Sequence, residues 1–179
     1  MPTLLLTYAT THGHTAKIAD RLAAALRAHG LDVDLRDIKQ VGDAVPGSFD
    51  AVVVGASLHA GHHQRAMLKW VKANRDALAD RPTMFFSVSL TAAEDAAEAR
   101  ESTQRCIDDF EEETGWKPTR SESVAGALQY REYDVFTRVL MRLKMRQGGH
   151  QADPSQDHEY TDWDALEQLA EEFAAQLTD

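Results

Sequence analysis

Short apolar runs recur along the chain and alternate with longer amphipathic stretches. Residues 49–55 (FDAVVVG) and 83–88 (TMFFSV) are largely apolar, as expected of strands buried in a parallel sheet. Residues 31–38 (LDVDLRDI) alternate apolar and polar side chains, which is typical of a strand with one exposed face at a sheet edge. The pattern predicts strands over residues 3–9, 31–38, 49–55, 83–88 and 122–128.

Helical spacing fills the intervals between these strands. Apolar residues three and four positions apart predict helices over residues 14–29, 65–78, 92–114 and 163–177. Thr161 is the predicted cap of the last helix. The predicted inner face of the acidic third helix consists of Ala92, Ala96, Ala99, Thr103, Cys106 and Phe110. Strands that alternate with helices indicate an α/β fold with a doubly wound parallel sheet, and we expect residues 1–179 to form a single domain.

Composition narrows the function classes. The chain is 43% hydrophobic and 27% charged, which is ordinary for a folded soluble protein. Its net charge of −10 argues against general nucleic-acid binding. The single cysteine, Cys106, excludes an internal disulfide and a cysteine-based metal site. No stretch has the apolar length of a membrane span and no signal peptide precedes the first strand, so we expect a cytoplasmic protein.

A candidate anion site follows the first strand. In residues 4–15 (LLLTYATTHGHT) an apolar strand ends in a turn of small and hydroxyl-bearing residues, and a helix begins there. The first turn of a helix has unpaired N–H groups and partial positive charge, and Gly13 lets an anion approach the backbone closely. The turn matches neither GxGxxG nor GxxxxGK[ST], so a phosphomonoester is the remaining ligand. The alternative is a threonine-capped helix start without a ligand.

This turn resembles the phosphate loop of the flavodoxin-like proteins, whose usual form is [ST]-x-T-G-x-T. His12 stands where that family has Thr. The resemblance implies FMN as the cofactor and a five-stranded sheet of order 2-1-3-4-5 with helices on both faces. The loops after the first, third and fourth strands would then meet at one edge. The residues implied for the FMN phosphate are Thr10, Thr11, His12, Gly13, His14 and Thr15.

The two later loops, 56–63 and 87–91, are expected to hold the flavin ring. They contain small, hydroxyl-bearing and histidine residues but no Phe, Tyr or Trp. This lining suits a flat ring that is bound through backbone contacts, lies against aliphatic and histidine side chains and has one face open to a substrate. The ring contacts implied by position are Ser57, Leu58, His59, Ala60, Ser87, Val88, Ser89 and Leu90.

Five histidines are expected at this edge, namely His12, His14, His59, His62 and His63. No carboxylate or cysteine accompanies them, so a proton relay or an anion contact is favoured over a metal, and we predict no metal site. The sequence identifies no catalytic acid or base.

A long insertion of about residues 129–160 separates the last strand from the last helix. Residues 134–147 have helical spacing, with Arg138, Arg142 and Arg146 in one stripe between two apolar faces. One interpretation is a contact for a membrane surface, a quinone or an anionic apolar substrate. The other is a helix packed against a second subunit of a homo-oligomer.

Motifs along nearly the whole chain resemble the menaquinone-dependent protoporphyrinogen IX dehydrogenase family. They are T-x-H-G-x-T, V-V-x-G-A-S, S-V-S-L, A-G-A-L-x-Y and Y-T-D-W, and the basic segment lies where that family has its insertion. The resemblance implies FMN-dependent oxidation of protoporphyrinogen IX to protoporphyrin IX in haem biosynthesis, with a quinone (menaquinone) as acceptor. The three arginines would contact substrate propionates, or anionic lipid at the inner face of the cell membrane. Two residues depart from the family pattern, since Arg and Tyr are common where this chain has His59 and Ala60.

The sequence is also compatible with three other functions. A flavodoxin-type electron carrier would explain the acidic composition but not the basic insertion. An NAD(P)H:quinone reductase lacks a dinucleotide fingerprint here. A domain that binds a protein partner and has lost its flavin is compatible with the same fold.

Overall fold

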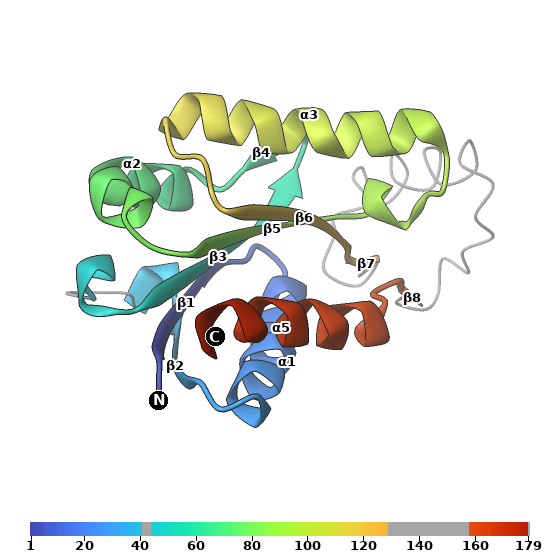
Figure 1. Cartoon of the computed structure of the whole chain (residues 1–179). Helices are drawn as coiled ribbons and strands as arrows, with labels where there is room; N and C mark the ends of the chain where they lie inside the picture. The colour runs from blue at the N-terminus through green and yellow to red at the C-terminus, as the bar shows by residue number, and fades with distance from the viewer. Residues whose placement is uncertain (41–43, 129–157, 179) are drawn as a thin grey trace.

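The computed structural model describes residues 1–40, 44–128 and 158–178. A parallel sheet forms the middle layer, with strand order β2-β1-β3-β5-β6 (Figure 1). Counting only its five parallel strands, this is the predicted 2-1-3-4-5 order, with β2 at the predicted edge. The strands are β1 (Thr3–Ala9), β2 (Asp32–Asp37), β3 (Ala51–His59), β5 (Thr83–Ser89) and β6 (Arg120–Ala125).

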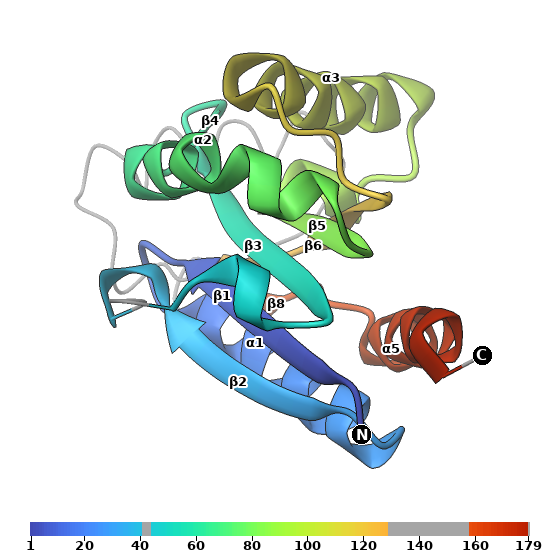
Figure 2. The ribbon, with the colours of Figure 1, turned by 60° about the vertical axis from the view of Figure 1, so that its left-hand side comes forward.

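In the described part of the chain, two helices pack on each face of the sheet. Helices α1 (His14–Ala28) and α5 (Trp163–Thr178) pack on one face, and α2 (Arg65–Ala79) and α3 (Ala97–Thr114) on the other (Figures 1 and 2). Successive side chains of a strand point to opposite faces, so Leu4 and Leu6 of β1 join the α1/α5 core while Leu5 joins the α2/α3 core. The doubly wound α/β architecture is therefore confirmed.

The segment predicted as the loop 56–63 is mostly strand. β3 continues to His59 because Ala56 and Ser57 still pair with β5. The chain then turns through Ala60 and Gly61, both with positive φ, and returns as β4 (His62–His63), antiparallel to β3. This two-residue strand is an addition to the predicted sheet.

The prediction of one strand over 122–128 also needs correction. β6 ends at Ala125, and after Gly126 the chain forms β7 (Ala127–Leu128), which pairs with β8 (His158–Glu159) in a separate two-stranded sheet. The two strands hold together the chain ends that flank residues 129–157. The predicted helix 134–147, with Arg138, Arg142 and Arg146, lies outside the described residues.

The predicted start and inner face of the third helix need correction. The helix begins at Ala97 rather than Ala92, because a 3₁₀ turn (Thr91–Ala93) precedes it. Ile107 is buried on the inner face of this helix, whereas Cys106, which was predicted there, is only partly buried.

The last helix is not capped by Thr161. Asp162 Oδ1 accepts a hydrogen bond from the Ala165 N–H at 3.0 Å, whereas the Thr161 hydroxyl donates to the Ala125 carbonyl at 2.7 Å. Asp162 directly precedes Trp163, the first residue of α5, so it stands in the N-cap position.

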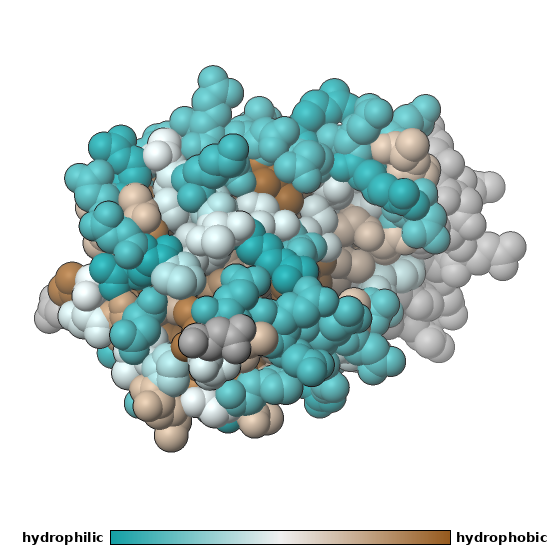
Figure 3. Space-filling view, in the orientation of Figure 1, coloured by the Kyte–Doolittle hydropathy of each residue, from teal (hydrophilic) through white to brown (hydrophobic). Residues whose placement is uncertain are grey.

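Hydrophilic residues cover most of the face seen in Figure 3. In the part of the chain that the structure describes, the large hydrophobic residues exposed to solvent are Met1 and Val45. Among the same residues, no helix is both long and apolar enough to cross a membrane.

Candidate cofactor site

The predicted phosphate turn connects β1 to α1. Gly13 adopts φ 86°, in the left-handed region that favours glycine, and its N–H donates to Thr10 Oγ1 at 2.9 Å. No side chain caps α1, and its first turn contains no acidic residue. A Cβ added at Gly13 would meet nothing within 4 Å. The first-turn N–H groups of α1 therefore have no capping side chain, no crowding at Gly13 and no acidic residue in that turn. These groups fit a phosphate.

His14, one of the predicted phosphate residues, is buried and its side chain has another partner. Its Nε2 lies 2.8 Å from Thr161 Oγ1. The single hydroxyl proton of Thr161 goes to the Ala125 carbonyl, so His14 Nε2 must be the donor in this pair. Burial lowers the pKa of His14, although the nearby Glu159 carboxylate acts in the opposite direction. His14 therefore offers the turn its backbone rather than its imidazole.

Glu159 of β8 ties the first turn of α1 to the start of α5. Its carboxylate accepts from Lys17 Nζ at 2.5 Å and from Trp163 Nε1 at 2.9 Å. These bonds, led by that of Lys17, lower the pKa of Glu159. Glu159 Oε2 also lies 3.9 Å from His14 Nδ1. The cluster joins residues far apart in sequence beside the phosphate turn.

The β3–β4 hairpin carries the first group of predicted ring contacts. His59 and Ala60 are exposed, and Ser57 and Leu58 are partly buried. The rings of His12 and His59 lie 6.0 Å apart between centroids, so the tip of the hairpin is close to the phosphate turn. The structure thus brings the first two predicted loops together.

The second group of predicted ring contacts is largely inside the sheet. Ser87 and Val88 belong to β5 and are buried, so the predicted loop 87–91 begins only after Ser89. Ser89 Oγ accepts from the Ala92 N–H at 3.2 Å, and Leu90 is partly exposed. Continued pairing of β5 with β6 through Ser89 explains the longer strand.

His63 anchors the hairpin in the α2/α3 core. Its Nε2 lies 2.8 Å from Ser87 Oγ, and its ring makes edge contacts with Phe85 and Phe110 at 5.3 and 5.1 Å between centroids. Burial lowers the pKa of His63 to about 4, with a smaller effect of His62 in the same direction. The imidazole is therefore neutral near pH 7.

Gln64, directly before α2, connects two of the predicted loops and was missed from sequence. Its Nε2 donates to Thr11 Oγ1 at 3.1 Å and to Ser57 Oγ. Its Oε1 is buried and has no hydrogen-bonding partner in the described ranges 1–40, 44–128 and 158–178. The only signal in the sequence was a polar residue between the histidine loop and a helix, and that signal is weak.

The five histidines are directed to different places. His14 bonds to Thr161 and His63 bonds to Ser87. The rings of His12 and His59 are neighbours at a tilt, and His62 is exposed on β4. Among the described residues, no group of three or more His, Cys, Asp or Glu side chains is arranged to hold a metal ion.

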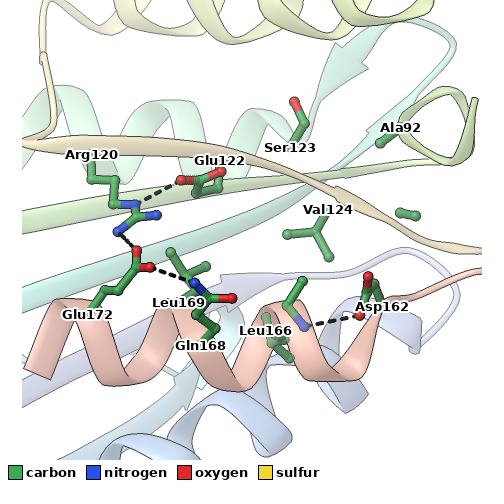
Figure 4. Close-up of a pocket in the computed structure, with 12 residues that line it drawn as sticks. Ala92, Arg120, Glu122, Ser123, Val124, Asp162, Leu166, Gln168, Leu169 and Glu172 are labelled. Atoms are coloured by element: carbon green, nitrogen blue, oxygen red, sulfur yellow. Dashed lines mark hydrogen bonds and ion pairs between the residues drawn. The ribbon is translucent and has the colours of Figure 1, made fainter. Parts of the chain in front are cut away.

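A separate pocket of about 360 Å³ lies between β6 and α5 (Figure 4). Val124, Leu166 and Leu169 line it, and at one end Arg120 pairs with Glu122 and Glu172 at 2.8 and 2.7 Å. None of the predicted cofactor residues lines this pocket. The candidate site therefore rests on the turn and the hairpin.

Comparison with known proteins identifies the family of the chain. The Flavodoxin domain family matches residues 5–155. The chain belongs to this family. Solved flavodoxins share its fold: a short-chain flavodoxin associated with a non-canonical PDU bacterial microcompartment has a TM-score of 0.64 at 16% identity, covering 99% of this chain and 100% of that one. Oxidised Flavodoxin 1 from Bacillus cereus has a TM-score of 0.59 at 15% identity, covering 98% and 99%.

Two curated relatives are more similar in sequence, and both are named Protoporphyrinogen IX dehydrogenase [quinone]. The Leishmania major protein is 35% identical over 178 residues, covering 97% of this chain and 75% of the relative. The Escherichia coli K12 protein is 32% identical over 179 residues, covering 100% of this chain and 97% of the relative.

Proposed function

We propose that this protein is an FMN-dependent oxidoreductase that oxidises protoporphyrinogen IX to protoporphyrin IX and passes the electrons to a quinone. The observation that carries the proposal is the pair of relatives with this name, which align with 97 and 100% of the chain. The alignments therefore include the long segment between β7 and β8.

The phosphate turn supports FMN as the cofactor. The first-turn N–H groups of α1 meet no capping side chain and no acidic neighbour in the helix, and Thr11 is exposed beside them. The N–H groups of α1 and the Thr11 hydroxyl would hold the phosphate, with Gly13 allowing its approach. The hairpin residues Ser57 to Ala60, together with Ser89 and Leu90, would flank the ring.

FMN supplies the redox chemistry when it is bound, accepting two electrons at a time. Protoporphyrinogen IX loses six electrons and six protons in becoming protoporphyrin IX, so each product requires three turnovers and three quinones reduced to quinols. The chain supplies binding and orientation. Because no Phe, Tyr or Trp occurs in 56–63 or 87–91, one face of the ring would stay open to the substrate. A flavin-loaded structure with both ring faces covered would contradict this arrangement.

The basic segment is the proposed contact for the anionic groups of the substrate or of lipid. Arg138, Arg142 and Arg146 would pair with porphyrinogen propionates, or with head groups at the inner face of the cell membrane. Replacing all three by Gln is expected to reduce turnover or binding to anionic vesicles. If neither changes, the segment has another role, such as contact with a second copy of the chain.

The test of the function is anaerobic. The purified protein is loaded with FMN and mixed with protoporphyrinogen IX and a menaquinone analogue, and porphyrin fluorescence is followed. We expect a quinone-dependent rise that is lost when Thr11 and Thr15 are both changed to Val. Thr178→Val, at the exposed end of α5, is the matched control and should keep the activity.

Bound FMN without porphyrin formation would overturn the proposed substrate. A stable semiquinone on stepwise reduction would then indicate an electron carrier. Consumption of NADPH with a soluble quinone would instead indicate a quinone reductase.

A further inference from the structure

Two consecutive residues connect the three predicted cofactor loops. His63 bonds to Ser87 at the end of β5, and Gln64 bonds to both Thr11 of the phosphate turn and Ser57 of the hairpin. His63 is buried and its ring contacts Phe110 in the α2/α3 core. Gln64 is only partly buried, and it lies between the place predicted for the phosphate and the place predicted for the ring.

The Gln64 amide fixes the direction of two hydroxyl groups. An amide nitrogen has two protons, and here one goes to Thr11 Oγ1 and the other to Ser57 Oγ. Each hydroxyl accepts from Gln64, so each keeps its own proton to donate elsewhere. Thr11 and Ser57 are thereby arranged as donors, which suits the acceptor oxygens of a phosphate and of a flavin.

The remaining atom of the amide is an acceptor in need of a donor. Gln64 Oε1 is buried and unpartnered among the described residues. Leaving a buried acceptor unpaired is energetically unfavourable. In FMN the link between phosphate and ring is a polyol chain with three hydroxyl donors, and this link must pass between Thr11 and Ser57 if the turn and the hairpin hold the two ends.

We propose that Gln64 is a further cofactor-binding residue, whose Oε1 accepts a polyol hydroxyl of FMN and whose amide directs the hydroxyls of Thr11 and Ser57 toward the cofactor. This inference rests on the proposed function, because it assumes that FMN is the ligand.

The test measures flavin binding to the apoprotein by the change in flavin fluorescence, and it needs no turnover. FMN and riboflavin are titrated separately, since riboflavin has the polyol and the ring but no phosphate. Gln64→Met keeps the length of the side chain and removes its hydrogen bonds. It should weaken riboflavin about tenfold through the lost polyol contact, and FMN by more, because Thr11 also loses its orientation toward the phosphate. Gln168→Met, on the exposed face of α5 where Gln168 bonds to Glu172, is the matched control and should bind both as wild type does.

Gln64→Glu reverses the direction of the hydrogen bonds to Thr11 and Ser57. A carboxylate accepts from both hydroxyls and adds negative charge near the phosphate, so FMN should be weakened about a hundredfold and riboflavin less. Partial unfolding would lower both affinities by one factor. A change in the ratio of FMN affinity to riboflavin affinity therefore indicates an effect at the site. Circular dichroism and the number of binding sites per protein show whether the variant is folded.

The outcomes separate the inference from the function. Wild-type affinity of Gln64→Met for both flavins overturns the inference and leaves FMN binding intact. A loss confined to FMN overturns the polyol contact. A wild-type apoprotein that binds no FMN overturns the proposed function and the inference together.

Discussion

His63 makes the fold sensitive to acid in a defined pH window. Its imidazole is 8% exposed, packs edge-on against the stacked rings of Phe85 and Phe110, and bonds to Ser87. Burial lowers its pKa from 6.5 to about 4. In the unfolded chain His63 binds a proton as the pH falls below 6.5, whereas in the folded protein it stays neutral until about pH 4. The unfolded state therefore binds more protons within this window, and folding stability falls with pH.

The magnitude follows from the two pKa values. One pKa unit corresponds to 1.36 kcal/mol, so a fall from pH 7 to pH 4.5 should remove about 2–3 kcal/mol of stability through His63 alone. This is a large fraction of the total for a domain with a typical stability of about 5–15 kcal/mol. The carboxylates of Asp50, Glu159 and Glu172 have lowered pKa values and add further acid sensitivity.

A substitution isolates the contribution of His63. Gln can bond to Ser87 but does not titrate. Between pH 7 and pH 4.5 the free energy of unfolding of His63→Gln is therefore expected to fall by about 2–3 kcal/mol less than that of wild type. At pH 7 the variant will be less stable than wild type. Urea unfolding at the two pH values gives both differences, and His29→Gln, at the exposed end of α1, is the matched control. Equal losses in wild type and His63→Gln would refute the reasoning.

Three smaller predictions concern the scaffold. Gly55→Ala would place a Cβ 2.0 Å from Cζ of Phe86, so it should cost about 1–3 kcal/mol in urea unfolding. Adding Phe86→Leu should recover part of that cost, and strict additivity would contradict the clash. Ala60 has φ 50°, so Ala60→Gly should raise the thermal midpoint by relieving about 1 kcal/mol of strain, and a lower midpoint would argue against strain. Asp162→Ala removes the N-cap bond to Ala165 and should cost about 1 kcal/mol of unfolding free energy, and no change would show that the cap is dispensable.

The sequence predicted the sheet because β1, β3 and β5 coincide with apolar runs and β2 with an apolar–polar alternation. It predicted the helices because their apolar spacing is regular. It failed after Gly55, where the apolar run ends but the strand continues. Pairing to a neighbouring strand uses the backbone, which small and polar residues such as Ala56 and Ser57 also provide. The turn through Ala60 and Gly61 then converts the expected loop into a hairpin.

The candidate site was predicted where a local motif determines it and missed where distant residues determine it. The threonine- and glycine-containing turn forms as expected between β1 and α1, because its chemistry lies in consecutive residues. His14 and His63 look equivalent to the other histidines in sequence, yet one bonds to Thr161, 147 positions away, and the other to Ser87. Such partners follow only from the tertiary fold.

The first turn of α1 contains both the candidate anion site and Lys17, which pairs with Glu159. One side of the turn offers N–H groups for an anion, and on the other side Glu159 holds the chain that leaves β8. A carboxylate so near an anion site would oppose binding if it were unpaired, but Lys17 lies 2.5 Å from it and compensates its charge. Lys17 is therefore engaged with Glu159 rather than with the ligand. Its positive charge makes the contact between β8 and α1 compatible with a phosphate bound at the same turn.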